Sequence, residues 1–284
     1  MNRSTATLDE VVVEALGVAT EAAKCAGKKL LCFLQDDTYW TQSKEDTSLQ
    51  TAADIAAEEV ILSRIQKAFP DHHIKSEERG SLSSFTPSLY RWNIDPLDGT
   101  ENFVLGIPYF SSCLTLYYEQ TPLLAVVYNP VTDELFTATE GGGAWLNGKQ
   151  LAVSQQNTLQ RSRAFFIPDF VTKRQSPAIL LRESLYHHCR RVLDTWSPAL
   201  DWCLVASGKA DFVVTFANGS ADADASAGMF ILKQAGGEIT DFSGRPYSPQ
   251  NRGQIVGSNK NLHALVLKLI KEVKGHDCNG NTFD

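Results

Sequence analysis

Apolar residues recur at helical spacing in two stretches near the start of the chain. The first stretch predicts a long amphipathic helix with Gly27 inside it, and the second, over 51–69, predicts a helix that stops at Pro70-Asp71. The first stripe consists of Leu8, Val12, Leu16, Ala19, Ala23, Leu30 and Leu34. Because each apolar face needs a partner, we expect both helices to cover a sheet.

From Arg91 onward the pattern changes to short runs of β-branched and aromatic residues separated by turn residues, which predicts an antiparallel meander. The runs lie at 92–94, 111–118, 123–128 and 134–139. Strands and helices are then expected to alternate, with a last amphipathic helix that contains 262–273. The predicted organisation is an N-terminal α+β half, 1–150, and a C-terminal α/β half, 151–284.

Composition narrows the classes of partner. With 284 residues, 43% of them hydrophobic, the chain is long enough to bury a full core. Its net charge of -7 and the absence of a long Lys/Arg cluster argue against a nucleic-acid or membrane-surface partner, so a small molecule is expected. The polar N-terminus and the absence of a bilayer-length apolar run predict a cytoplasmic protein.

The six cysteines contain no Cys-x-x-Cys pair, and a chain of this length needs no disulfide staples, so reduced thiols are expected. His187, His188 and Cys189 are consecutive. Three adjacent side chains do not converge on one ion without other ligands, so we do not interpret them as a zinc site.

Candidate chemistry concentrates where an apolar strand runs into Asp95-Pro96-Leu97-Asp98-Gly99-Thr100 and a predicted helix start. Pro96 restricts the backbone, so two carboxylates and the Leu97 carbonyl can face one concavity, and such hard oxygen ligands suit Mg²⁺. Gly99 permits close backbone approach, and N–H groups at a helix start attract phosphate. The alternative interpretation is an Asp-rich turn followed by an ordinary helix cap.

Further acidic residues lie at Glu77, Glu78 and Asp224. Taken alone, the glutamate pair is compatible with surface charge, and Asp224 is compatible with a helix N-cap. Their joint meaning with the loop at 95–100 comes from the resemblance to a known family.

The chain closely resembles the inositol monophosphatase family, which belongs to a larger group of lithium-sensitive, magnesium-dependent phosphatases that includes fructose-1,6-bisphosphatases. Asp-Pro-Leu-Asp-Gly-Thr-x-Asn-Phe at 95–103 matches the first family signature, and 224–228 followed by Gln-Ala-Gly-Gly at 234–237 resembles the second. The resemblance implies an αβαβα sandwich of mixed α+β and α/β character, Mg²⁺ as cofactor, and a homodimer.

Carried over to this sequence, the resemblance implies one Mg²⁺ on Glu77, Asp95 and the Leu97 carbonyl and another on Asp95, Asp98 and Asp224, with a third ion near Glu77 in some members. The catalytic residues implied are Glu77, Asp54 and Thr100, the last two orienting the attacking water. The phosphate is expected against Asp98 and the backbone of Gly99 and Thr100, with Trp196 and Thr215 lining the rest of the substrate pocket.

The sequence departs from the family where the substrate is expected. Ala223 precedes Asp224 where a tryptophan is usual, Thr215-Phe216 stands where an acid for substrate hydroxyls is expected, and Trp196-Ser197-Pro198 replaces Gly-Thr-Ala. The resemblance implies hydrolysis of a small phosphomonoester resembling inositol 1-phosphate, but a pocket with these departures need not prefer inositol. Fructose 1,6-bisphosphate, histidinol phosphate and 3′-phosphoadenosine 5′-phosphate are the alternative substrates. A regulatory or binding protein with a retained phosphatase site is the alternative function.

Overall fold

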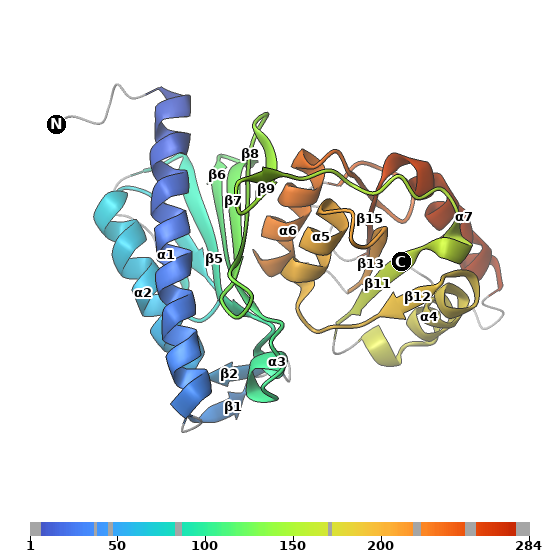
Figure 1. The fold of residues 1–284 in the computed structure, drawn as a ribbon, viewed down its shortest axis with the longest axis horizontal. Helices are drawn as coiled ribbons and strands as arrows, with labels where there is room; N and C mark the ends of the chain where they lie inside the picture. Colours follow the sequence, from blue (N-terminus) through green and yellow to red (C-terminus); the bar gives the residue numbers. More distant parts are fainter. Residues whose placement is uncertain are drawn as a thin grey trace.

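The computed structural model describes residues 7–36, 39–44, 48–82, 87–169, 172–217, 223–247 and 254–276, without the side chains of 223–225 and 274–276. Five layers alternate across the long axis of the molecule, in the order helices, sheet, helices, sheet, helices (Figure 1). This is the αβαβα sandwich that the sequence predicts.

The first layer consists of α1 (Leu8–Asp36) and α2 (Ala52–Ala68), which are connected through a small hairpin of β1 (Thr41–Ser43) and β2 (Leu49–Thr51). Both predicted helices are thus confirmed. Alanines line the buried face of α1, and a side chain at Gly27 would lie 2.7 Å from the Tyr128 ring. Small residues therefore let α1 approach the sheet closely.

The first sheet has eight strands in the order β10-β9-β8-β7-β6-β5-β3-β4. They are β3 (His73–Ser76), β4 (Gly80–Leu82), β5 (Tyr90–Asp98), β6 (Ser111–Tyr118), β7 (Thr121–Asn129), β8 (Glu134–Thr139), β9 (Gly143–Leu146) and β10 (Lys149–Gln150). Strands β5 to β8 form the predicted antiparallel meander, whereas β3 pairs with β5 in parallel. A short helix, α3 (Thr100–Val104), follows β5.

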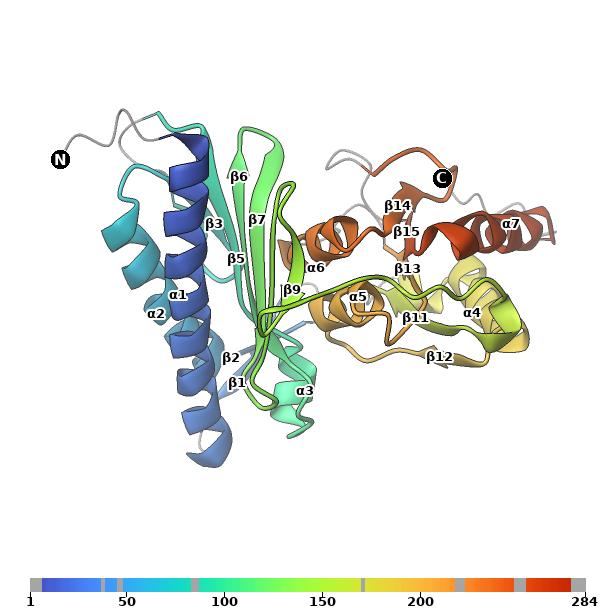
Figure 2. The ribbon, with the colours of Figure 1, turned by 45° about the horizontal axis from the view of Figure 1, so that its top comes forward.

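The middle layer is formed by α5 (Pro198–Ala206) and α6 (Ala223–Gln234), which lie between the two sheets (Figures 1 and 2). The second sheet has the order β12-β11-β13-β15-β14, and α4 (Ser176–His188) and α7 (Lys260–His276) cover its outer face. Its strands are β11 (Arg163–Pro168), β12 (Arg191–Leu193), β13 (Phe212–Phe216), β14 (Glu238–Asp241) and β15 (Gln254–Ser258). One apolar cluster joins both sheets through α5 and α6. The end of β5 meets the start of α5 directly, because Ser197 Oγ and Ala199 N both donate to Asp98 Oδ2.

None of the helices in the described part of the chain combines the length and the apolar character that crossing a bilayer requires.

Candidate active site

The acidic loop, residues 95–100, begins inside β5, which lies between β6 and β3 in the first sheet. All five residues from Ile94 to Asp98 are buried, and the pairing of β5 with β6 shifts register between Asp95 and Asp98. Pro96 lies in this interval and has no N–H for the ladder. Its carbonyl accepts a hydrogen bond from Ser112 Oγ at 2.7 Å, and Leu97 N donates to Asp95 Oδ1 at 2.9 Å. The irregular backbone and the Asp95 carboxylate are thus fixed locally.

Asp98 is held from a distant part of the chain. Its side chain is 3% exposed, and Oδ2 accepts hydrogen bonds from Ser197 Oγ at 2.6 Å, Ala199 N at 3.2 Å and Ser111 Oγ at 3.3 Å. Burial raises the pKa of Asp98 to about 7, although these three donors lower it. Among the described residues, all three donors end on Oδ2, which leaves Oδ1 available to a further ligand.

Gly99 connects the loop to α3 with a φ of 92°, and its carbonyl accepts from Phe103 N at 3.0 Å. A Cβ there would lie 3.1 Å from both Ser197 Cβ and the Tyr109 carbonyl oxygen. Both the backbone conformation and the space therefore require glycine.

Asp54 reaches the loop from the first turn of α2. Its Oδ2 accepts from Thr51 N at 2.7 Å in a capping box, and Thr100 Oγ1 lies 3.2 Å from its Oδ1 and 3.0 Å from the Leu97 carbonyl oxygen. Burial raises the pKa of Asp54 to about 7, Thr51 opposes the shift, and the charges of Glu78 and Glu77 add to it. The Asp54 and Thr100 pair that the sequence predicts is therefore in contact.

Glu77 follows β3 and is anchored to the acidic strand, because its N–H donates to the Ile94 carbonyl at 3.1 Å. Lys44 Nζ lies 2.6 Å from Glu77 Oε1 and 2.9 Å from Glu78 Oε1, and Gln50 also donates to Glu78. Burial alone would lower the pKa of Lys44, but these two carboxylates raise it. Lys44 thus neutralises charge where the resemblance implies a cation.

The remaining predicted residues differ in how they relate to this loop. Asp224 lies in the first turn of α6, but its side chain is outside the described residues. Trp196 directly precedes Ser197 and is 53% exposed. Thr215 lies within β13, 6% exposed, with its hydroxyl 3.1 Å from Ile255 N. The substrate contacts of Trp196 and Thr215 stay predictions.

Several residues around the loop were not foreseen. Asn102 Nδ2 donates to the carbonyls of Tyr109 at 2.7 Å and Thr195 at 2.6 Å. Asp201, fully buried, accepts from Tyr109 Oη at 2.9 Å and Thr195 Oγ1 at 2.5 Å. Asn102 belongs to the family signature, but no sequence pattern links it or Ser111 to their partners.

The donor chemistry fits a hard divalent cation. Asp95 and Asp98 are buried carboxylates three residues apart on one strand. Burial is the main cause that raises the pKa of Asp98, and the charge of Glu77 raises it further. Such an accumulation of acid is relieved by a cation with oxygen ligands. Among side chains that the structure describes, no three His, Cys, Asp or Glu residues are gathered closely enough to hold a metal ion. Completing a site therefore requires Asp224 or a Glu77 released from Lys44.

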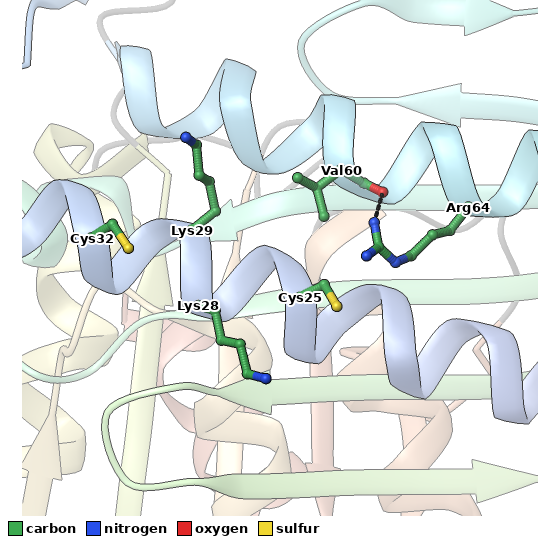
Figure 3. A pocket seen from close by; sticks show the side chains of 6 residues that line it. All are labelled: Cys25, Lys28, Lys29, Cys32, Val60 and Arg64. Atoms are coloured by element: carbon green, nitrogen blue, oxygen red, sulfur yellow. Dashed lines mark hydrogen bonds between the residues drawn. The ribbon is translucent and has the colours of Figure 1, made fainter.

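A hollow between α1 and α2 has a different character. Its lining consists of Cys25, Lys28, Lys29, Cys32, Val60 and Arg64 (Figure 3). It contains no carboxylate, and Arg64 Nη1 donates to the Val60 carbonyl at 3.2 Å. The hollow therefore lacks the anionic ligands that a hard cation needs, and the acidic loop is the candidate site.

Comparison with known proteins agrees with this arrangement. The profile described as "Inositol monophosphatase family" matches residues 11–274. The chain belongs to the inositol monophosphatase family. The Nus factor SuhB of Vibrio cholerae is 33% identical to this chain, and the alignment covers 94% of this chain and 97% of that protein. Inositol monophosphatase 3 of Solanum lycopersicum is 34% identical, with 92% and 98% covered. The solved structure of the Thermotoga maritima IMPase matches with a TM-score of 0.81 and 30% identity, covering 92% of this chain and 98% of that one.

Proposed function

We propose that this protein is a magnesium-dependent phosphatase that hydrolyses a small phosphomonoester by attack of water. The observation that carries the proposal is the contact of Asp54 with Thr100 beside the buried carboxylates Asp95 and Asp98. Family membership supports the same reaction class.

The proposed ligands are Glu77, Asp95, the Leu97 carbonyl, Asp98 and Asp224, for two ions and a third near Glu77. When bound, Mg²⁺ supplies a Lewis acid that polarises water and neutralises phosphate oxygens. Asp98 offers Oδ1 because its hydrogen bonds hold Oδ2, so its carboxylate stays oriented without a ligand.

Proton removal is proposed for Asp54 acting through Thr100. Thr100 Oγ1 has one hydrogen and two acceptors in range, Asp54 Oδ1 and the Leu97 carbonyl oxygen. When the hydrogen is directed to Asp54, an Oγ1 lone pair can accept a proton from water while the hydroxyl passes its own proton to Asp54 Oδ1. Burial raises the pKa of Asp54 to about 7, a value suited to a proton acceptor near neutral pH. The backbone N–H groups of Gly99 and Thr100 are the proposed phosphate contacts.

The test is phosphate release by the purified full-length chain at several Mg²⁺ concentrations, with and without lithium. The panel contains inositol 1-phosphate, fructose 1,6-bisphosphate, histidinol phosphate and 3′-phosphoadenosine 5′-phosphate. Asp95→Asn is expected to abolish release and to remove the thermal stabilisation by Mg²⁺. Asp9→Asn, an equal change on the exposed first turn of α1, serves as the control. Activity that survives Asp95→Asn contradicts the proposed ligand set.

A second candidate function is binding to a macromolecular partner, because curated relatives named Nus factor SuhB carry the name of a factor rather than of an enzyme. A pull-down with wild-type protein and with Asp95→Asn addresses it. A stoichiometric partner retained by both proteins, with no turnover on the panel, favours this role over hydrolysis.

A further inference from the structure

Trp196 has an unusual backbone conformation for its size. Its φ is +58°, a left-handed region that L-residues with bulky side chains rarely adopt. The other described non-glycine residues with positive φ are Glu119, Asp133 and Asn147, and each of these lies in a hairpin connection between consecutive strands. Trp196 instead lies immediately before α5, next to the acidic loop.

Bonds on both sides of Trp196 fix this conformation. The carbonyl of Thr195 accepts from Asn102 Nδ2 at 2.6 Å, and Ser197 Oγ donates to Asp98 Oδ2 at 2.6 Å. Strained conformations of this kind persist where the surroundings determine them, and they concentrate at functional sites. The segment 195–197 is therefore attached to the loop that the proposed reaction uses.

The Trp196 side chain does not compensate for this conformation by joining the core. It is 53% exposed, and it belongs to none of the described apolar clusters. The amide of Asn102 that holds Thr195 also holds the Tyr109 carbonyl at 2.7 Å, so the segment that follows α3 is adjacent. In that segment Ile107 is 40% exposed. Two exposed apolar side chains thus belong to segments that Asn102 joins beside the acidic loop.

Thr215, which stands where an acid for substrate hydroxyls is expected, already uses its hydroxyl in hydrogen bonds within the protein. The Thr215 hydroxyl accepts from Ile255 N at 3.1 Å and lies 3.5 Å from the Ile255 carbonyl oxygen within the second sheet. A polyol is recognised by hydrogen bonds to its hydroxyls, whereas an aromatic group needs only a flat apolar face.

We infer that Trp196 is a stacking surface for the alcohol portion of the substrate, and that the preferred substrates are phosphomonoesters whose alcohol portion carries a planar aromatic ring, as the base of a nucleotide does. This inference rests on the proposed phosphatase function. It makes Trp196 a residue that determines specificity, while the acidic loop next to it carries the reaction.

The experiment compares kcat/KM for adenosine monophosphate and for inositol 1-phosphate at saturating Mg²⁺. Wild-type protein is expected to prefer the nucleotide. Trp196→Gly should lower the ratio of the two values by about fivefold or more, mainly through KM for the nucleotide, since stacking on one base is typically worth about 1–3 kcal/mol. Trp196→Phe retains a ring and should keep most of the preference.

Two controls separate stacking from damage to the fold. Trp145→Gly makes the same change at a tryptophan of β9 that is 37% exposed, and it should leave the ratio unchanged. Trp196→Gly also relieves the positive φ, so its melting temperature should not fall. A lower ratio in a variant of undiminished stability is therefore a direct effect on substrate.

The outcomes distinguish the two hypotheses. If wild type and Trp196→Gly hydrolyse both esters with the same ratio, the stacking role is wrong and the phosphatase function stands. The same holds if wild type prefers the inositol ester, or if the variant changes only self-association. If wild-type protein hydrolyses neither these esters nor the wider panel, the proposed function fails, and the stacking role fails with it.

Discussion

Replacement of Ser197 by alanine tests whether the partners of Asp98 prepare it to bind a cation. Ser197 is fully buried and occupies the N-cap position of α5, yet its hydroxyl caps no backbone group of that helix. It donates instead to Asp98 Oδ2 at 2.6 Å. In Ser197→Ala, Asp98 keeps only the longer bonds from Ala199 N at 3.2 Å and Ser111 Oγ at 3.3 Å.

The magnitude follows from the kind of bond that is lost. A hydrogen bond to a charged group contributes about 1.5–3 kcal/mol, so the free energy of unfolding should fall by up to that amount. The loss also favours the protonated form of Asp98, because Ser197 is the donor that most lowers its pKa. Removing the partner of a metal ligand typically weakens metal affinity by about 10–100-fold, and we expect the Mg²⁺ requirement of Ser197→Ala to increase accordingly.

Two measurements check this expectation: phosphate release as Mg²⁺ is titrated, and thermal denaturation over the same range of Mg²⁺. Ser207→Ala is the matched control, because Ser207 lies at the other end of α5 and donates to the Leu204 carbonyl at 3.0 Å. It should cost some stability without changing the Mg²⁺ midpoint. If Ser197→Ala and Ser207→Ala require the same Mg²⁺ concentration as wild type, Ser197 does not position Asp98 for a cation.

Two further predictions concern backbone geometry and pH. Gly99→Ala and Gly106→Ala both place a side chain at positive φ, which should lower the free energy of unfolding by about 1–2 kcal/mol in each variant. Only at Gly99 does the new Cβ also lie 3.1 Å from the Tyr109 carbonyl oxygen. Chemical denaturation should therefore show a larger loss for Gly99→Ala, and phosphate release should be abolished in that variant alone; equal losses of stability contradict the crowding. Burial of His263 lowers its pKa, and the charge of Glu238 opposes that shift. The contribution of the neutral ring to the free energy of unfolding is therefore complete above the ordinary pKa of 6.5, and it is lost as the pH falls below that value. The decline in melting temperature between about pH 8 and about pH 5 should be smaller in His263→Gln than in wild type, and an unchanged decline refutes the assignment.

The sequence predicts the long elements of this fold well because their periods extend over several turns or strand repeats. The first helix and strands β6 and β8 lie where the apolar pattern indicates. Strands β1, β2, β9 and β10 contain two to four residues each, too few to show a period, and they were not predicted. Their pairing depends on neighbours in the sheet.

In the candidate site too, residues within one short stretch of sequence could be predicted, whereas contacts between residues far apart in the sequence could not. Asp95, Asp98 and Gly99 are recognised from one contiguous stretch, since their chemistry depends on a turn that follows a buried strand. The bond from Ser197 to Asp98 joins residues 99 positions apart, and that from Asn102 to Thr195 joins residues 93 apart. These contacts arise where the segment that leads into α5 meets the end of β5 and α3.

In the proposed function, that arrangement lets reaction and specificity vary separately. Ser197 holds Asp98 through its side chain, and Thr195 is held by Asn102 through its carbonyl, so the intervening residue makes neither of these bonds. A substitution at Trp196 therefore changes what is displayed beside the loop without removing a partner of Asp98. The segment can accept a tryptophan at positive φ because its two anchors are independent of the side chain between them.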